Sequence, residues 1–264
     1  MERAEIAEAA AEELPGLLRY ARTLTRDPAD AEHLVQDTLT RALERAPAFR
    51  GDSSLTTWLH RIMHNLAVDR ARRRREVPSD AVAEEVEARW REDAYTVDAA
   101  TVAARSEDRE ELLEALAHLP THYRSAVVLH DVEQMTARQI AEIHGIGLPA
   151  AKQRLRRGRM MLVSELARGH ERRVALKGVP LRCWEARRRV SDYLDGELAD
   201  ADAARLEHHL EGCPTCPPLY AALVASTEAL AATLPRDPDS VVPPALAERL
   251  AALQVPAGLD DPEA

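Results

Sequence analysis

The stretch TARQIAEIHGIGLPAAKQRLRRGR, residues 136–159, predicts two short helices joined by a tight turn. Thr136 is a good N-cap and Gln139 follows it three positions later, and together they form the capping box that starts many helices. Gly145 and Gly147 break the chain between the helices, and either can take a positive φ without steric cost. Pro149 suits the first turn of a second helix, because its missing N–H is not needed there.

The second of these helices is basic and has no acidic residue between residues 152 and 159. Its positive side chains are Lys152, Arg154, Arg156, Arg157 and Arg159. Because a basic face without counter-charges repels itself, this composition favours a phosphate partner. A basic helix after a glycine turn is the helix-turn-helix pattern, whose second helix enters a DNA major groove. The alternative is a helical hairpin with a solvated basic face.

The whole chain is acidic, but its charge is segregated. Its 264 residues are enough for two or three small domains, and its net charge of −10 argues against a generic nucleic-acid binder. Residues 50–75 and 152–159 are strongly basic, whereas residues 76–111 and 183–264 are strongly acidic. Two basic patches therefore alternate with two acidic segments.

The composition predicts an all-α, cytoplasmic protein. Aromatic residues make up 3% of the chain, and alanine and leucine dominate over β-branched runs. No apolar run is long enough for a membrane span, and residues 1–16 lack the apolar core of a signal peptide. Nothing pairs a nucleophile with a base or leaves an open metal position, so we do not expect an enzyme.

The first 75 residues predict three helices. We expect a short helix over residues 17–25, after Pro15 and Gly16, a second over residues 28–45 and a third over residues 55–75. The second helix has an apolar stripe, and its other sides carry Asp30, Gln36, Asp37 and Arg41. These four are ordinary solvated residues unless a partner uses them.

The third predicted helix combines an aromatic ring with amide and basic side chains. They are Trp58, His60, Arg61, Asn65 and Arg70, followed by the run Arg72, Arg73, Arg74 and Arg75. Ring faces stack on unpaired bases and guanidinium groups hold phosphate, so this set suits nucleic acid whose bases are unstacked. The alternative for Trp58 is a place in the core.

Three blocks of sequence now resemble one family. AEHLVQDTLTRAL, FRGDSSLTTWLHRIMHNLAVDRARRRR and LPTHYRSAVVLHDVEQMTARQIAEIHGIGLPAAKQRLRRGR are similar to the extracytoplasmic-function (ECF) sigma factors of bacterial RNA polymerase. That family contains two conserved helical domains, called region 2 and region 4. The resemblance covers about residues 17–166. The region 2 and region 4 motifs occur in the family's order, with an acidic linker between them.

The resemblance implies roles for matching positions. Core RNA polymerase would be bound through Asp30, Gln36, Asp37 and Arg41. The promoter −10 element would be read by residues 49–54 with Trp58, His60, Arg61, Asn65 and Arg70. The −35 element would be read as duplex DNA by Arg138, Pro149, Ala150, Lys152, Arg154 and Arg157. His33 departs from the family's pattern, which usually has an acid there.

The acidic linker of residues 76–106 has few large apolar residues, so it could be disordered or form short helices. In the family the equivalent linker threads the RNA exit path of the polymerase, where acidic character would mimic RNA. The expected organisation is region 2 over 1–75, the linker over 76–106, region 4 over 107–169, a second linker over 170–181, a zinc-binding domain over 182–234 and a flexible tail over 235–264.

The three cysteines fall late in the chain and suit a metal or redox site better than a disulfide framework. Cys213 and Cys216 have the C-x2-C spacing of a metal knuckle, and His209 precedes them by one helical turn. With Cys183 they form a Cys3His set typical of structural zinc. His208 is a rival ligand, and the alternative is a buried Cys183 thiol beside a surface histidine.

CPTC and YLDGEL in this last unit resemble the zinc-binding anti-sigma domain, which is normally a separate protein. Fused here to a sigma-like chain, it could contact the sigma domains and inhibit them in cis, it could be required for activity, or it could sense metal or thiol oxidation. Two other functions stay open: a stand-alone helix-turn-helix regulator, and a regulator in which the Cys/His cluster is the primary sensor.

Overall fold

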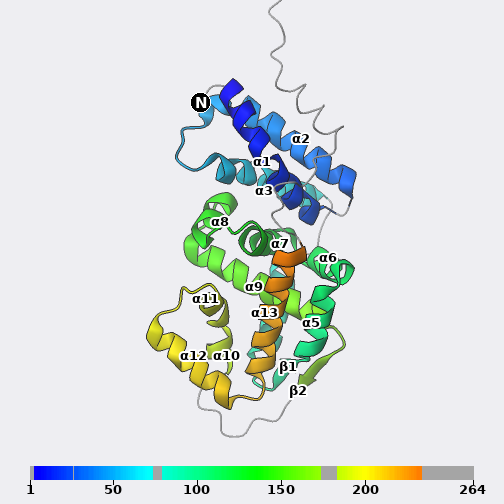
Figure 1. Cartoon of the computed structure of the whole chain (residues 1–264), viewed down its shortest axis with the longest axis vertical. Coiled ribbons are helices and arrows are strands. Elements are labelled where there is room, and N and C mark those ends of the chain that lie inside the picture. Colours follow the sequence, from blue (N-terminus) through cyan, green and yellow to red (C-terminus); the bar gives the residue numbers. More distant parts are fainter. Residues whose placement is uncertain (1–2, 26, 74–78, 174–182, 234–264) are drawn as a thin grey trace, which may run out of the picture.

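The computed structural model describes residues 3–25, 27–73, 79–173 and 183–233. Helices account for nearly all regular structure in these ranges, which confirms the all-α prediction. In Figure 1 the N-terminal helices form one end of an elongated molecule, the central helices follow, and the C-terminal helices pack beside them. None of the described helices is both long enough and apolar enough to cross a bilayer.

The N-terminal bundle consists of α1 (Arg3–Leu24), α2 (Pro28–Glu44) and α3 (Leu55–Arg73). The prediction that the first helix begins at residue 17 was wrong, because α1 continues through Pro15. A proline inside a helix loses one hydrogen bond. Burial of Ile6 and Ala10 before the proline offsets that loss.

Side chains cap the starts of α2 and α3. The Asp27 carboxylate accepts a hydrogen bond from the Ala29 N–H at 2.7 Å. Ser54 Oγ accepts one from the Thr57 N–H at 3.1 Å. Such caps satisfy amide donors that have no partner within the helix. Arg74 and Arg75, the end of the predicted arginine run, lie outside the described residues.

From Ser79 onward the acidic linker forms two helices and a strand, so this part adopts short regular elements rather than a disordered chain. Its elements are α4 (Ser79–Arg91), β1 (Tyr95–Val97) and α5 (Ala99–Glu107). Trp90 is 1% exposed, and its indole N–H donates to Ser164 Oγ at 3.0 Å. β1 pairs antiparallel with β2 (Glu171–Arg173), a short ladder that the helical reading did not predict.

The central domain contains α6 (Arg109–His118), α7 (Thr121–Val127) with a π-helical turn over Val128–Val132, α8 (Ala137–His144) and α9 (Leu148–Leu166). Gly158 lets α9 approach α7 closely. A Cβ at this position would lie 2.6 Å from Val127 Cγ2 and 2.9 Å from the Tyr123 carbonyl oxygen. The missing side chain therefore fixes the distance between these two helices.

The C-terminal unit contains α10 (Cys183–Arg187), α11 (Val190–Leu194), α12 (Asp200–Gly212) and α13 (Cys216–Thr233). α13 packs along α5 and also contacts α9 (Figure 1). Leu219, Leu223 and Leu230 of α13 are buried in the same hydrophobic cluster as the central domain. The unit is thus joined to the rest of the molecule by apolar packing. The predicted flexible tail lies outside the described residues.

Candidate nucleic-acid interface and metal centre

The helix-turn-helix of α8 and α9 has the local geometry that the sequence predicts. The Gln139 N–H donates to Thr136 Oγ1 at 3.3 Å, and the Thr136 N–H donates to Gln139 Oε1 at 2.9 Å, which completes the capping box. Gly145 ends α8 with a φ of 64°, a conformation that favours glycine. Pro149 lies in the first turn of α9.

The basic face of α9 has counter-charges, so the argument that it lacks them was wrong. Arg157 Nε donates to Glu87 Oε2 at 2.7 Å, and Arg156 lies 3.4 Å from the same carboxylate. Lys152 Nζ contacts Glu197 Oε2 at 2.6 Å. These acids are distant in sequence and come from α4 and from the loop after α11. Only the tertiary fold brings them to α9.

Arg159 has a structural role within this folded form. Its side chain is 3% exposed and donates to the carboxylates of Asp131 and Asp195 and to Ser191 Oγ. Burial alone would raise the pKa of Asp131, but the Arg159 charge and its hydrogen bonds lower it. Arg159 therefore joins α9 to the C-terminal unit and does not face solvent.

The residues predicted to read the −35 element divide into two groups. Arg138, Pro149 and Ala150 are exposed at the start of the two helices. Lys152, Arg154 and Arg157 are half-buried, and each contacts a neighbouring element. Arg154 Nη1 lies 3.1 Å from His144 Nδ1, where it donates to the imidazole.

The residues predicted to read the −10 element lie around a loop and along α3. Arg61 and Asn65 are exposed, whereas Trp58 and His60 are 7% and 1% exposed. The Trp58 ring packs against Phe49 with centroids 5.0 Å apart. A cavity of about 240 Å³ opens beside them, and its lining residues are Ala48, Phe49, Arg50, Asp52, Ser53, Trp58, Arg61 and Glu142. Glu142 belongs to α8, so the central domain borders this cavity.

The residues predicted to bind polymerase lie along α2. Asp37 and Arg41 are exposed, and Asp30 and Gln36 are half-buried. Asp37 Oδ2 accepts a hydrogen bond from Arg70 Nη2 at 2.6 Å. One predicted polymerase contact and one predicted −10 contact are therefore paired across α2 and α3.

A polar seam joins the N-terminal bundle to the central domain, and sequence reasoning did not predict it. Ser125 Oγ lies 3.0 Å from His64 Nδ1, 2.9 Å from His144 Nε2 and 2.6 Å from the Tyr20 hydroxyl. Burial lowers the pKa of His64 to about 3. No short motif marks such a seam, because its members come from four separate helices.

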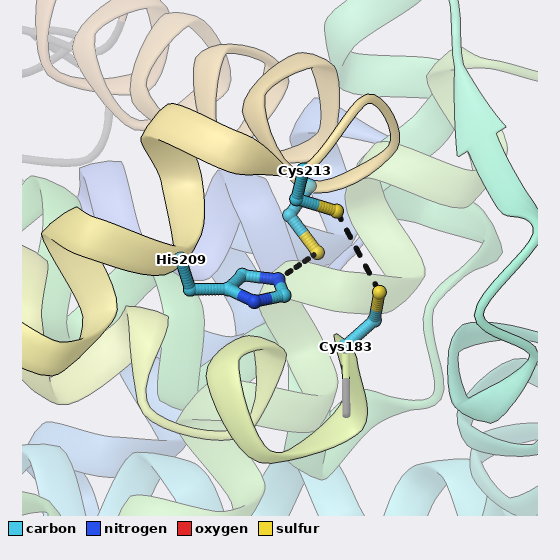
Figure 2. A group of neighbouring side chains, drawn as sticks. Cys183, His209 and Cys213 are labelled. Carbon is cyan, nitrogen blue, oxygen red and sulfur yellow. Dashed lines mark hydrogen bonds between the residues drawn. The ribbon is translucent and has the colours of Figure 1, made fainter. Parts of the chain in front are cut away.

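The four predicted metal ligands come together. Cys183, His209, Cys213 and Cys216 offer ligand atoms that all lie within 4.8 Å of one another. Cys183 Sγ is 3.6 Å from Cys213 Sγ, and His209 Nε2 is 3.2 Å from Cys216 Sγ. Figure 2 shows Cys183, His209 and Cys213 converging from separate segments. The rival His208 points outward, with its side chain 72% exposed.

The donor set fits a zinc ion. Bond lengths of about 2.3 Å to sulfur and about 2.0 Å to nitrogen place the ligand atoms of a tetrahedral site about 3.5 Å apart. Burial lowers the pKa of His209, which keeps the imidazole in the neutral form that binds metal. His209 Nδ1 is buried without a hydrogen-bond partner among the described residues. Burial raises the pKa of the Cys216 thiol, so its thiolate depends on a nearby cation.

Arg187 connects this cluster to the acidic linker. Its Nε donates to Cys216 Sγ at 3.4 Å, and its Nη atoms donate to the carbonyls of Trp90 and Tyr95, both at 2.8 Å. Thr215, inside the C-x2-C knuckle, also donates to the Asp93 carbonyl at 3.0 Å. Sequence reasoning missed Arg187, which sits among three consecutive arginines with no signal to distinguish it.

Comparison with protein families finds three matches along the chain. Sigma-70 region 2 matches residues 10–77, Sigma-70 region 4 matches residues 109–162, and a zinc-finger family matches residues 183–216. The first two cover the N-terminal bundle and the helix-turn-helix domain. The third begins at Cys183 and ends at Cys216, so it contains all four residues of the cluster.

The chain is also similar to individual known proteins. The ECF RNA polymerase sigma factor SigG of Mycobacterium tuberculosis is 35% identical over 164 residues, which are 55% of this chain and 44% of SigG. The ECF RNA polymerase sigma factor SigM of the same organism is 33% identical over 146 residues, 55% of this chain and 69% of SigM. The match thus spans less than half the length of SigG.

Among solved structures, the chain is similar to the sigma factor RpoE of Bartonella quintana, solved in complex with the anti-sigma factor NepR. The sequences are 25% identical, and the match covers 61% of this chain and 97% of that one. The TM-score is 0.42, so the superposition carries no argument about how the domains are arranged.

Proposed function

Because the chain belongs to the ECF family of RNA polymerase sigma factors, we propose that it binds core RNA polymerase in the cytoplasm and directs promoter-specific initiation of transcription. The observation that carries the proposal is the order of region 2 and region 4, each on its own helical domain. The chain supplies recognition, and the chemistry of RNA synthesis belongs to the polymerase. This protein is therefore not an enzyme in its own right.

The polymerase and the two promoter elements each have a candidate surface on this chain. The exposed side chains of α2 would dock on the polymerase, with Asp37 and Arg41 the most accessible of the four. The cavity beside Trp58 and Arg61 would receive bases of the melted −10 element. The start of α9, from Pro149, would enter the major groove of the −35 duplex.

We further propose that Cys183, His209, Cys213 and Cys216 hold one structural zinc ion. When bound, the ion would supply the positive charge that lets three buried thiols persist as thiolates. The protein's own residues fix the position of the site. Thr215 and Arg187 bind the linker carbonyls beside it, so the site cross-links α10, α12 and α13 next to β1.

The C-terminal unit is proposed to inhibit in cis by covering α9. Glu197 contacts Lys152, Asp195 contacts Arg159, and the Trp184 ring lies over the Arg156 guanidinium at 5.1 Å. A tethered partner acts at high effective concentration, so modest contacts are enough to compete with DNA. Lys152 is one of the residues assigned to the −35 element, and the same side chain cannot hold Glu197 and a phosphate at once.

The test is run-off transcription with core RNA polymerase on a matched promoter. We would compare the full chain, a chain ending at Arg168, and a full chain with Glu197→Gln. The matched control is Glu228→Gln, which removes an exposed acid of α13 and the same charge. Higher activity from the truncated chain and Glu197→Gln supports cis inhibition. A truncated chain that is folded but inactive means that the unit is required, and no activity from any form contradicts the sigma-factor proposal.

A further inference from the structure

One carboxylate of the acidic linker sits at the centre of a cluster of arginines. Glu87 lies on α4, and its side chain is 5% exposed. Arg157 Nε donates to Oε2 at 2.7 Å, while Arg91 and Arg156 contact Oε1 at 3.1 and 3.4 Å. Two of these three arginines belong to α9, the proposed recognition helix. The contact joins segments 70 positions apart in the sequence.

A second interaction holds Arg156 in the same place. The Trp184 ring of α10 lies 5.1 Å from the guanidinium carbons of both Arg156 and Arg91. Arginine over an aromatic face is a favourable cation–π arrangement. Arg156 Nη1 is nevertheless buried without a hydrogen-bond partner among the described residues. Glu87 therefore provides the anionic contact for a side chain that still has an unused donor.

Glu87 remains ionised in this setting. Burial alone would raise the pKa of its carboxyl, but the charges of Arg156 and Arg157 lower it below the ordinary value. A carboxylate that accepts hydrogen bonds from two arginines resembles a phosphate in charge and in the geometry of its oxygens. The arginines of α9 are thus arranged as they would be around one DNA phosphate.

We propose that α4 is a lid on the recognition helix, in which Glu87 occupies Arg156 and Arg157 as a phosphate mimic that duplex DNA must displace. This inference rests on the proposed function, since it takes α9 as the helix that binds the −35 duplex. It differs from inhibition by the C-terminal unit, because α4 belongs to the linker between the two sigma domains. The linker would then restrict DNA binding in addition to the C-terminal unit, whose Trp184 contacts the same Arg156.

The test measures binding of the full, zinc-loaded chain to a fluorescein-labelled duplex of mixed sequence by fluorescence anisotropy. Such a probe is sufficient because phosphate contacts do not depend on sequence. Glu87→Gln removes the mimic, and Glu85→Gln is the matched control, an exposed glutamate of the same helix with the same loss of charge. We expect Glu87→Gln to bind about tenfold more tightly than the wild type, as for one regained charged hydrogen bond.

The salt dependence of the same titrations provides a second sign of the mechanism. Each phosphate contact regained by Arg156 or Arg157 steepens the plot of log affinity against log salt by about 0.9. If Glu87→Gln and Glu85→Gln increase the affinity for duplex equally, the loss of one negative charge explains the increase, and the lid proposal is overturned. Wild-type affinity for Glu87→Gln would overturn it as well.

Hydrogen–deuterium exchange on the unmodified chain keeps the test independent of how the variants fold. Saturating duplex should raise exchange in α4 and lower it in α9. Continued protection of α4 at saturation overturns the lid but leaves DNA binding by α9 intact. If neither the wild type nor the variants bind duplex at low salt, the assignment of α9 fails and the lid fails with it.

Discussion

The imidazole of His64 in α3 stacks on the imidazole of His144 in α8, with ring centroids 4.0 Å apart and planes inclined by 10°. Ser125 Oγ lies within hydrogen-bond distance of both rings, and Arg154 lies 3.1 Å from the far side of His144. The helix proposed to read the −10 element is thus fastened to the helix-turn-helix proposed to read the −35 element. If the two proposed surfaces bind separate promoter elements, they would have to move apart, and we therefore propose that the stack marks a closed form.

Acidification should open this closed form. Burial lowers the pKa of His64 to about 3, and burial, followed by the charges of His64 and Arg154, lowers the pKa of His144 further. The ordinary value is about 6.5. Histidines held neutral stabilise the closed form fully above pH 6.5, and this contribution is lost as the pH falls toward the lowered values. The contribution of each histidine to the stability of the closed form falls by about 1.4 kcal/mol for each pH unit between pH 6.5 and its lowered pKa.

The measurement for this prediction is the distance between labels on α2 and α12, followed by energy transfer from pH 7.5 to pH 5. His64→Phe keeps a ring in the stack and removes one titrating group, so its opening should depend less steeply on pH. His122, with a pKa lowered by burial to about 4, faces the same arginine and contributes in the same direction. A distance that stays constant over this range contradicts the prediction.

Loss of the proposed metal ligand His209 should release zinc, whereas loss of its neighbour His208 should not. His209→Ala removes a fully buried ring whose Nε2 lies 3.2 Å from Cys216 Sγ. His208→Ala is the matched control, because the His208 side chain is 72% exposed and its imidazole lies 3.6 Å from the Glu211 carboxylate, away from the cysteines. Zinc per purified chain, measured by atomic emission, should be close to one for His208→Ala. It should be well below one for His209→Ala, because loss of one ligand lowers the affinity for zinc at least tenfold. Equal zinc in both variants would reject His209 as a ligand.

Replacing Arg159 should destabilise the fold strongly. Its guanidinium neutralises the carboxylates of Asp131 and Asp195 while only 3% exposed. Arg159→Leu leaves the carboxylates of Asp131 and Asp195 in a buried site with His130 but no arginine beside them, which costs about 3–5 kcal/mol of unfolding free energy. Arg168→Leu is the comparison, since Arg168 is 66% exposed and its pair with Glu165 contributes less than about 1 kcal/mol. Urea titrations of the two variants would contradict this account if their midpoints agreed.

Gly158→Ala should separate α7 from α9. The new methyl would lie 2.9 Å from the Tyr123 carbonyl oxygen, a backbone atom that cannot rotate away. Overpacking of this kind costs about 1–3 kcal/mol. Gly212→Ala serves as the control, because nothing lies within 4 Å of its Cβ position. Thermal unfolding should show a lower Tm for Gly158→Ala alone, and an unchanged Tm there would mean that the helices tolerate a wider spacing.

Local signals in the sequence were sufficient to predict the helix-turn-helix and the Cys/His cluster. The capping box of Thr136 and Gln139 acts over three residues, and the chain can form it without help from the rest of the fold. Three of the four ligands fall between His209 and Cys216 on one helix end and the next helix start. The start of the first helix was predicted wrongly because Pro15 suggests a helix boundary, whereas the burial of Ile6 and Ala10 against other helices is visible only in the folded structure.

By itself, then, the sequence determined the helical class and the Cys3His set, because each depends on propensity or on spacing within a short stretch. Its resemblance to the ECF sigma factors indicated the two sigma regions in order. The tertiary structure alone decided which polar and charged groups contact one another. Glu87 reaches Arg157 across 70 positions, Ser125 reaches His64 across 61, and Thr96 reaches Thr215 across 119. Such pairs leave no periodic trace, since a carboxylate or hydroxyl reads the same in the chain whether it faces water or an arginine. Their partners exist only after apolar burial has placed the helices side by side.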